Sequence, residues 1–393
     1  MNNLSIAICG AGPAGLSSAL ALHRAGHAVT VFEQFDAAMP VGSGLILQPT
    51  GLAVLDWLGL GERMRNLAAR IDRLFGTAAG RVVLDVRYAA LGDARGYAVH
   101  RAALFNVLHD AVVEAGIKII TSRRIVTLEK RQLVFDDGRR EGPFDLVIDA
   151  MGTRSPLIPL ASGPDTRRPL AYGAIWASLP WPGGNFDPHA LEQRYREAAI
   201  MCGVLPIGRI DERGIPQTAF FWSLRHREYE AWRHAGLDRW KEQVLQLWPE
   251  TAPLVQGVNA DSQMTLARYE HRTLALPYGT GLAFVGDSAH STSPQLGQGA
   301  NMALLDTYAL THALAAQNTI QDALAAYAKA RHWHVWLFQT MSFMFTPFYQ
   351  SDSMLLPFIR DRLVASISRL PPAQRFLATL VSGRLGLRQR GLP

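Results

Sequence analysis

The spacing of apolar residues predicts a strand–helix–strand unit near the N-terminus. A short apolar run at 4–9 is followed by a helical pattern at 13–25 and by a second apolar run at 28–32. Continuous apolar runs of this length are typical of buried parallel strands, whereas apolar positions in a helix recur every three to four residues. Later apolar runs at 146–148 and 282–285 are expected to add strands to the same domain.

The remaining chain shows further helices and a region that is richer in long strands. Helices are expected at 51–60, 101–115, 228–248 and from 320 onward, with a break at Pro371-Pro372. Strands are expected at 117–120, 125–128 and 133–135, a hairpin at 74–99, and longer strands at 170–179, 200–207 and 217–224.

These elements predict an α/β fold with three parts. The first is a Rossmann-like dinucleotide-binding domain, the second an inserted antiparallel-sheet domain that would hold the substrate, and the third a helical C-terminal region. We place the nucleotide domain at 1–73, 97–166 and 260–335, the inserted domain at 74–96 and 167–259, and the C-terminal region at 336–393.

The composition is that of a globular protein in a reducing compartment. The chain has 393 residues, of which 48% are hydrophobic and 18% charged, which excludes wholesale disorder. Its two cysteines, Cys9 and Cys202, form no disulfide framework or metal-binding pattern. We expect no signal peptide and no membrane-spanning helix, because no basic segment precedes the first apolar run and no stretch of about 18 apolar residues occurs. The expected location is the cytoplasm.

The formal net charge of +6 is concentrated in the last part of the chain. Residues 318–393 contain nine Arg or Lys and three Asp, so the rest of the chain sums to about zero. Together with an apolar run at 336–348, this charge suggests peripheral contact with an anionic membrane. Covering helices with solvated arginines, a dimer surface, or closure of a substrate pocket would explain the same residues. No nucleic-acid partner is expected, because the basic residues are not interleaved with a reader motif.

A glycine-rich sequence follows the first predicted strand and opens the first predicted helix. In the sequence GAGPAG at 10–15, Gly10 permits a tight turn, Gly12 lets the backbone approach a pyrophosphate, and Gly15 lets the helix pack against the strand. Glu33 ends the second strand, where its carboxylate can accept hydrogen bonds from ribose hydroxyls. The loop predicts a dinucleotide site but does not separate NAD from FAD.

A second glycine-rich loop, at 286–301, connects an apolar run to a helical pattern. Asp287 is suited to hold a chain of hydroxyl groups, and the N–H groups of 299–301 would stabilise negative charge on a ring that accepts electrons. Arg101, at the start of another helix, is placed to reach the cofactor. No hydrolytic constellation appears, and His332 and His334 do not share a helical face, so no metal site is expected.

These motifs resemble those of the single-component FAD-dependent aromatic hydroxylases, the group A flavoprotein monooxygenases related to p-hydroxybenzoate hydroxylase and the ubiquinone-biosynthesis hydroxylases. The resemblance extends over about residues 4–340. The first glycine loop matches the family's ADP-binding element, 42–49 match the loop beside the flavin ring, and 286–301 with Asp306 match the second FAD fingerprint. It implies FAD as the cofactor and these contact residues: Gly10, Gly12, Ala14, Gly15, Glu33, Gly44, Leu45, Arg101, Val126, Asp287, Pro294, Gly297, Gly299, Ala300 and Asn301.

One element departs from the family pattern. Where the family carries an Asp-Gly pair after a buried strand, this chain reads Asp149-Ala150-Met151-Gly152. The family links this element to both FAD and NAD(P)H handling. Either Asp149 substitutes from two residues upstream, because residues i and i+2 of a strand face the same way, or Met151 only packs and the function is carried elsewhere. Around Gly42 the chain also lacks an arginine that some members use for the nicotinamide.

The resemblance implies a monooxygenase cycle. NAD(P)H would reduce FAD, O₂ would add to give a flavin C4a-hydroperoxide, and one oxygen atom would pass to an aromatic or hydrophobic heterocyclic molecule. Tyr172, Trp176 and Trp222 are expected to face this substrate, and no catalytic residue is assigned. The alternatives are an FAD-dependent dehydrogenase or reductase on the same scaffold, which Met151 favours, and a flavin-binding sensor without turnover.

Overall fold

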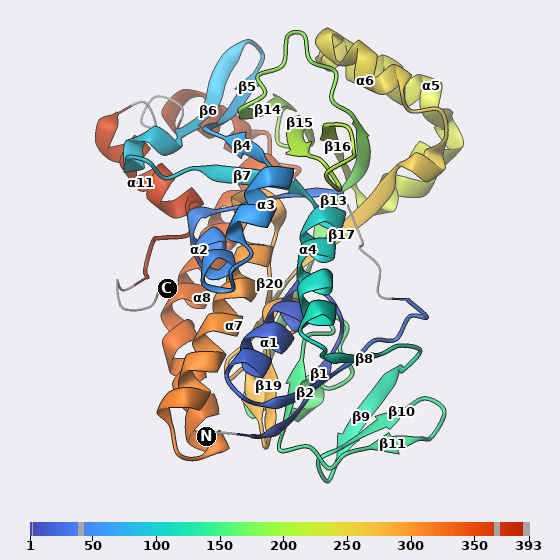
Figure 1. Cartoon of the computed structure of the whole chain (residues 1–393). Helices are drawn as coiled ribbons and strands as arrows, with labels where there is room; N and C mark the ends of the chain where they lie inside the picture. Colours follow the sequence, from blue (N-terminus) through green and yellow to red (C-terminus); the bar gives the residue numbers. More distant parts are fainter. Residues whose placement is uncertain (2, 38–42, 365–369, 388–393) are drawn as a thin grey trace.

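A six-stranded sheet organises the half of the molecule that holds the N-terminus (Figure 1). Its order is β18 (Tyr278–Gly279), β19 (Leu282–Phe284), β12 (Leu146–Asp149), β1 (Ser5–Cys9), β2 (Ala28–Phe32) and β8 (Lys118–Ile120). All neighbours pair in parallel except β18, which is antiparallel to β19. The computed structural model describes residues 1, 3–37, 43–364 and 370–387, so Gly42 lies outside it.

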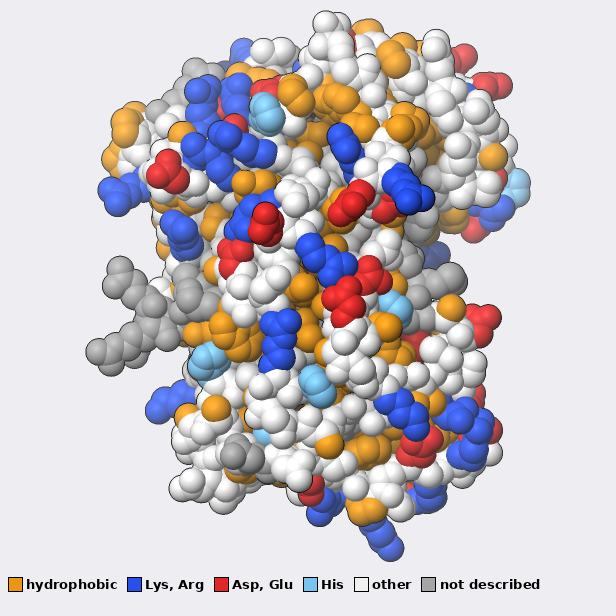
Figure 2. Space-filling model, viewed as in Figure 1, with side chains coloured by type: hydrophobic (Ala, Val, Ile, Leu, Met, Phe, Trp, Pro, Cys, Tyr) orange, Lys and Arg blue, Asp and Glu red, His pale blue; other side chains and the backbone are white. Residues whose placement is uncertain are grey.

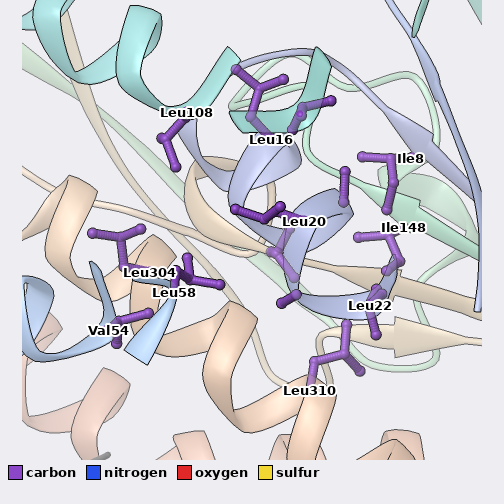
Figure 3. Close-up of a cluster of buried hydrophobic side chains, with 14 of the residues drawn as sticks. Ile8, Leu16, Leu20, Leu22, Val54, Leu58, Leu108, Ile148, Leu304 and Leu310 are labelled. Carbon is purple, nitrogen blue, oxygen red and sulfur yellow. The ribbon is translucent and has the colours of Figure 1, made fainter. Parts of the chain in front are cut away.

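Helices cover one face of this sheet, and a small sheet covers the other. Against the first face lie α1 (Pro13–Arg24), α4 (Arg101–Glu114) and α7 (Gly299–Ala316), with α2 (Pro49–Trp57) and α3 (Gly61–Leu67) packed beside them. Figure 3 shows leucines of these helices meeting the buried strand residues Ile8 and Ile148. The second face packs against β9 (Ile125–Glu129), β10 (Gln132–Phe135) and β11 (Arg140–Glu141). Apolar runs without alternation are therefore buried on both sides.

An eight-stranded sheet forms the other half. Its order is β20 (His290–Ser291), β17 (Thr265–Leu274), β13 (Asp165–Pro180), β16 (Gln217–Arg225), β15 (Ile200–Gly208), β14 (Ala190–Arg196), β5 (Arg73–Ala78) and β6 (Arg81–Arg87). Helices α5 (Tyr229–Leu247, kinked at Gly236) and α6 (Ala252–Gln256) cover one face. A three-stranded sheet of β3 (Gly44–Leu47), β7 (Gly96–His100) and β4 (Ala69–Ile71) lies between the halves.

The C-terminal part is helical. The long helix α8 (Ile320–Tyr349) packs along α7, and α9 (Leu355–Ile359), a π-helical turn (Arg360–Val364) and α11 (Pro371–Val381) follow. Within the described residues, no helix combines the length and apolar character that crossing a bilayer requires.

The predicted fold class is confirmed, and four details are corrected. The boundary predicted at 335/336 falls inside α8, which is one continuous helix. Residues 265–274, assigned to the nucleotide domain, form β17 and pair with β13 of the large sheet, because both strands extend from one half into the other. Pro371-Pro372 begins α11 rather than breaking a helix, since proline is tolerated in a first helical turn. The strand β14 was not predicted.

Candidate functional site

The first glycine loop leaves open space at the start of α1. Gly10 adopts φ +100°, and a Cβ on Gly15 would lie 1.9 Å from the Gly10 carbonyl oxygen, so both positions require glycine. A Cβ on Gly12, the residue that caps α1, would meet no atom within 4 Å. The first N–H groups of a helix lack intrahelical partners, so this space suits an anion such as a pyrophosphate.

Glu33 lies beside this loop at the end of β2. Its carboxylate accepts hydrogen bonds from the N–H groups of Ala11 (2.8 Å) and Phe35 (3.1 Å) and is largely buried. Glu33 therefore fixes the glycine loop directly, and the ribose contact stays a prediction. Val126 of β9 exposes 41% of its surface and is accessible to a ligand.

The second loop meets the first at the N-terminal ends of α1 and α7. A Cβ on Gly286 would contact both Ala14 of α1 and Ala303 of α7, and one on Gly299 would lie 3.9 Å from Asp287 Oδ1. The side chain of Asp287 is exposed, although its neighbours in the turn are buried. Desolvation by the surrounding protein raises its pKa, and the charges of His290 and Arg101 oppose this effect.

A buried ionic cluster fixes the second loop from behind. The Asp306 carboxylate accepts hydrogen bonds from the Gly286 N–H (2.9 Å), His290 Nε2 (2.6 Å) and Arg331 Nε (2.7 Å). Burial alone would raise the pKa of Asp306, but His290 and Arg331 outweigh it and lower that pKa. Sequence reasoning matched Asp306 to a motif, but it missed His290 and Arg331, which no local pattern marks.

Asn301, predicted to contact the cofactor, is wholly buried and joins two loops. Its Oδ1 accepts from the Gln48 N–H (2.8 Å), and its Nδ2 donates to the carbonyls of Ile46 (3.0 Å) and Gly297 (2.9 Å). These bonds correct the prediction for its side chain, which is fully engaged in holding β3 against the start of α7. The backbone N–H groups at 299–301 stay the candidates for ligand contact.

Arg101 stands at the start of α4 next to the β3 loop. Its N–H donates to the Ser43 carbonyl (2.8 Å), and Gly44 and Leu45 pair with β7 residues. The Arg101 side chain is exposed and makes no hydrogen bond or ion pair with any residue the structure describes. It does influence the pKa of both Asp287 and Tyr269, which places its charge between the second loop and the large sheet.

A chain of hydrogen bonds joins the large sheet to the β3 loop. Nδ1 of His100 accepts from the Ala102 N–H (3.0 Å), so its Nε2 carries the proton and donates to Ser178 Oγ (3.1 Å). Ser178 Oγ lies 2.8 Å from Ser43 Oγ. Burial lowers the pKa of His100, which favours this neutral form. The sequence gave no signal for this link, because its members are far apart in the chain.

The three predicted substrate-facing aromatics have three different environments. Trp176 is half-buried on the Ser178 face, stacks near Phe221 (4.5 Å between ring centroids) and donates to Tyr269 Oη (2.9 Å). Tyr172 lies on the same face but is buried, with its hydroxyl bonded to Asp352 (2.6 Å) and Arg225 (2.9 Å).

Trp222 corrects the prediction outright. It pairs with Ile175, on the opposite face from Trp176, and packs in the core beneath α5 with Phe220, Trp240 and Trp248. Tyr172 is therefore sequestered at the far end of the sheet and Trp222 on the wrong face, which leaves Trp176 of the three.

The altered element after β12 is closed on itself. Asp149 is wholly buried and accepts from the Met151 N–H (2.9 Å) and from Ser155 Oγ. Burial raises its pKa to about 7, while Ser155, Met151 and Arg272 act to lower it. Met151 packs on the cluster between the two smaller sheets. Of the two alternatives, the packing role of Met151 fits, because the Asp149 carboxylate is occupied.

The remaining polar residues show no metal centre. No group of three or more His, Cys, Asp or Glu side chains in the described part of the chain could hold a metal ion. His332 is exposed and His334 is buried, so the two point apart as expected.

Comparison with known proteins identifies the family. The model for the FAD binding domain matches residues 3–134 and 218–342. The 3-amino-4-hydroxybenzoate 2-monooxygenase of Streptomyces cremeus is 27% identical and aligns over 84% of this chain and 83% of its own. The 3-hydroxybenzoate 6-hydroxylase of Polaromonas naphthalenivorans is 25% identical, with 84% of each chain covered.

Solved structures show the same fold. Klebsiella pneumoniae HpxO, complexed with FAD and uric acid, superimposes with a TM-score of 0.80 at 20% identity and covers 97% of this chain and 98% of its own. The tetrameric form of 2-methyl-3-hydroxypyridine-5-carboxylic acid oxygenase gives a TM-score of 0.79 at 18% identity, with 96% of each chain covered.

Proposed function

Because the chain belongs to the FAD binding domain family, we propose that it is an FAD-dependent monooxygenase that hydroxylates an aromatic or hydrophobic heterocyclic small molecule. The relatives and structures named above support this proposal, since each is a monooxygenase, a hydroxylase or an oxygenase, or holds FAD with an aromatic heterocycle. The dehydrogenase alternative has no counterpart among them.

The observation that carries the proposal is the meeting of two glycine loops at two helix starts. Open space at Gly12, the exposed carboxylate of Asp287 and the first turn of α7 form one continuous polar lining. These groups fit the pyrophosphate, the hydroxyl chain and the electron-accepting ring of FAD. FAD supplies the electron transfer and O₂ activation that amino-acid side chains lack.

The protein's own groups hold and orient the reactants. The exposed guanidinium of Arg101 offers a positive charge to an anionic part of the cofactor, and the N-terminus of α7 stabilises negative charge on the ring. Trp176, Phe221 and Tyr269 supply an aromatic wall for a flat, apolar substrate. Burial raises the pKa of Tyr269 to about 12, so it is a neutral hydrogen-bonding group at physiological pH.

NAD(P)H is the proposed reductant, and the cytoplasm is the proposed location, with membrane contact only through the C-terminal region. The Asp149 carboxylate is engaged by Met151 and Ser155, so nicotinamide binding must use other groups. We therefore expect NAD(P)H oxidation to be insensitive to Asp149→Asn at constant FAD occupancy.

Turnover with isotopically labelled oxygen tests the proposal. The purified chain, loaded with FAD, is mixed with NADH or NADPH and a panel of hydroxylated benzoates and N-heterocycles under ¹⁸O₂, and products are analysed by mass spectrometry. One ¹⁸O atom per product molecule is expected. Gly12→Ala, which should fold but bind FAD weakly, is the matched control. Oxidised product without label would establish a dehydrogenase instead, and bound FAD that no substrate or nicotinamide reduces would establish a non-catalytic flavoprotein.

A further inference from the structure

One face of α8 presents large apolar side chains to solvent. Trp333, Trp336, Phe343 and Met344 recur at helical spacing and expose 56%, 47%, 52% and 57% of their surface. The two tryptophan rings stack with centroids 4.8 Å apart. We call these four residues the α8 outer face.

The α8 outer face is not needed for the core of the fold. The opposite side of the same helix carries the buried residues that pack against α7 and the loop before it, namely Leu324, Tyr327, Val335 and Phe338. Large side chains contribute about 150–250 Å² each, so four that are half-exposed present on the order of 400 Å², the size of the largest patch on a typical monomer. A patch of that size marks an interaction surface.

The charges around this face have one sign. Lys329 lies one turn before Trp333 on the same face, is exposed, and makes no ion pair with a described residue. The guanidinium of Arg168, also exposed, lies 4.9 Å from the centre of the Phe343 ring. The sequence contains no carboxylate between Asp322 and Asp352. By contrast, acidic and basic side chains are intermixed on the face that Figure 2 draws.

We propose that the α8 outer face docks on an anionic lipid surface. Tryptophan and phenylalanine insert into the boundary between headgroups and acyl chains, and flanking Lys and Arg are attracted to anionic headgroups. A second copy of this chain is the less favoured occupant, because an isologous contact would bring two sets of Lys329 and Arg168 together without a carboxylate to oppose them. The docking is independent of the proposed catalysis, which is measured without lipid.

Vesicle cosedimentation of the full chain with bound FAD tests this surface. Vesicles of phosphatidylcholine with phosphatidylserine are compared with phosphatidylcholine alone at low ionic strength. We expect binding to the anionic vesicles only. Phe343→Ser with Met344→Ser should reduce the partition coefficient at least about tenfold, because apolar insertion is lost. Lys329→Gln and Arg168→Gln should each reduce it about fivefold, which corresponds to ~1 kcal/mol per basic residue.

Ile215→Ser is the matched control, since Ile215 is 59% exposed in the loop between β15 and β16, away from α8. It should bind vesicles as the unaltered protein does. The chain has a net charge of +6, so adsorption by general electrostatics would survive the two apolar substitutions, and that result would overturn the proposal. So would the absence of binding, or a dimer seen by light scattering that these substitutions dissociate.

Discussion

Asp306→Asn should destabilise the protein more than any surface charge change, because it removes the counter-charge of a buried guanidinium. Asp306 has no exposed surface, and Arg331 exposes 4%. Breaking a buried ion pair by removing one partner costs about 3–5 kcal/mol, since the remaining charge stays desolvated. The Gly286 N–H keeps an acceptor only if the new amide adopts one orientation. We therefore expect a loss of about 3–5 kcal/mol in the free energy of unfolding and weaker FAD binding.

Asp56→Asn is the control, because the Asp56–Arg65 pair lies on the surface, with side chains 47% and 36% exposed. Exposed pairs contribute about 0–1 kcal/mol. Urea unfolding of the FAD-free protein, followed by tryptophan fluorescence, measures stability, and flavin fluorescence quenching measures FAD affinity. If Asp306→Asn shifts the unfolding free energy by no more than Asp56→Asn does, the buried cluster does not anchor the loop as argued.

The same substitution has a defined pH signature. The folded-state pKa of Asp306 is lowered by His290 and Arg331, despite an opposing effect of burial. Its stabilisation is thus present above the ordinary carboxyl pKa of about 4 and is lost as the pH falls through the lower folded value. The unaltered protein should lose stability on acidification to a greater extent than Asp306→Asn, and parallel acid limbs would contradict this account.

Three further predictions concern the site and its surroundings. Gly15→Ala should prevent stable folding, because its Cβ would lie 1.9 Å from a backbone oxygen, whereas Gly12→Ala should keep its melting temperature and lose FAD affinity; equal melting temperatures would refute this contrast. Ser178→Ala should lower kcat/KM about threefold to tenfold, the equivalent of one hydrogen bond, with FAD affinity unchanged and activity restored by Ser178→Thr. Asp149, whose folded pKa is about 7, should cost the protein stability as the pH rises from about 4 to 7, by up to ~4 kcal/mol, and Asp149→Asn should flatten this slope in urea unfolding measured across that range.

Local sequence patterns were sufficient for the nucleotide-binding half. The glycine spacing at 10–15 follows from backbone clashes that involve only neighbours in the chain, as the contact between Gly15 and Gly10 shows. The strands β1, β2 and β12 are buried on both faces, so their continuous apolar runs were unambiguous. Strand β14 was missed because its sequence ALEQRYR carries few apolar residues, although pairing with β15 and β5 holds it in the sheet.

Polar contacts between distant segments could not be predicted in this way. His290 and Arg331 meet Asp306 from another strand and another helix, and Asn301 reaches backbone groups near residue 47. Each of these side chains is individually unremarkable in the sequence, and only the folded chain shows that burial forces it to find a partner. The assignment of Asn301 as a cofactor contact failed for this reason.

The error at Trp222 was avoidable by a physical argument. Alternation places Trp222 and Trp176 on opposite faces of the sheet once β13 and β16 are paired in register. The helical segment after β16 carries Trp240 and Val244 one turn apart, so it needs an apolar face to cover. A short connection from β16 lets this helix reach only the adjacent sheet face, and that face holds Trp222. The face that remains for the cofactor and substrate is then that of Trp176 and Ser178, which is where the hydrogen-bonded link to the β3 loop begins.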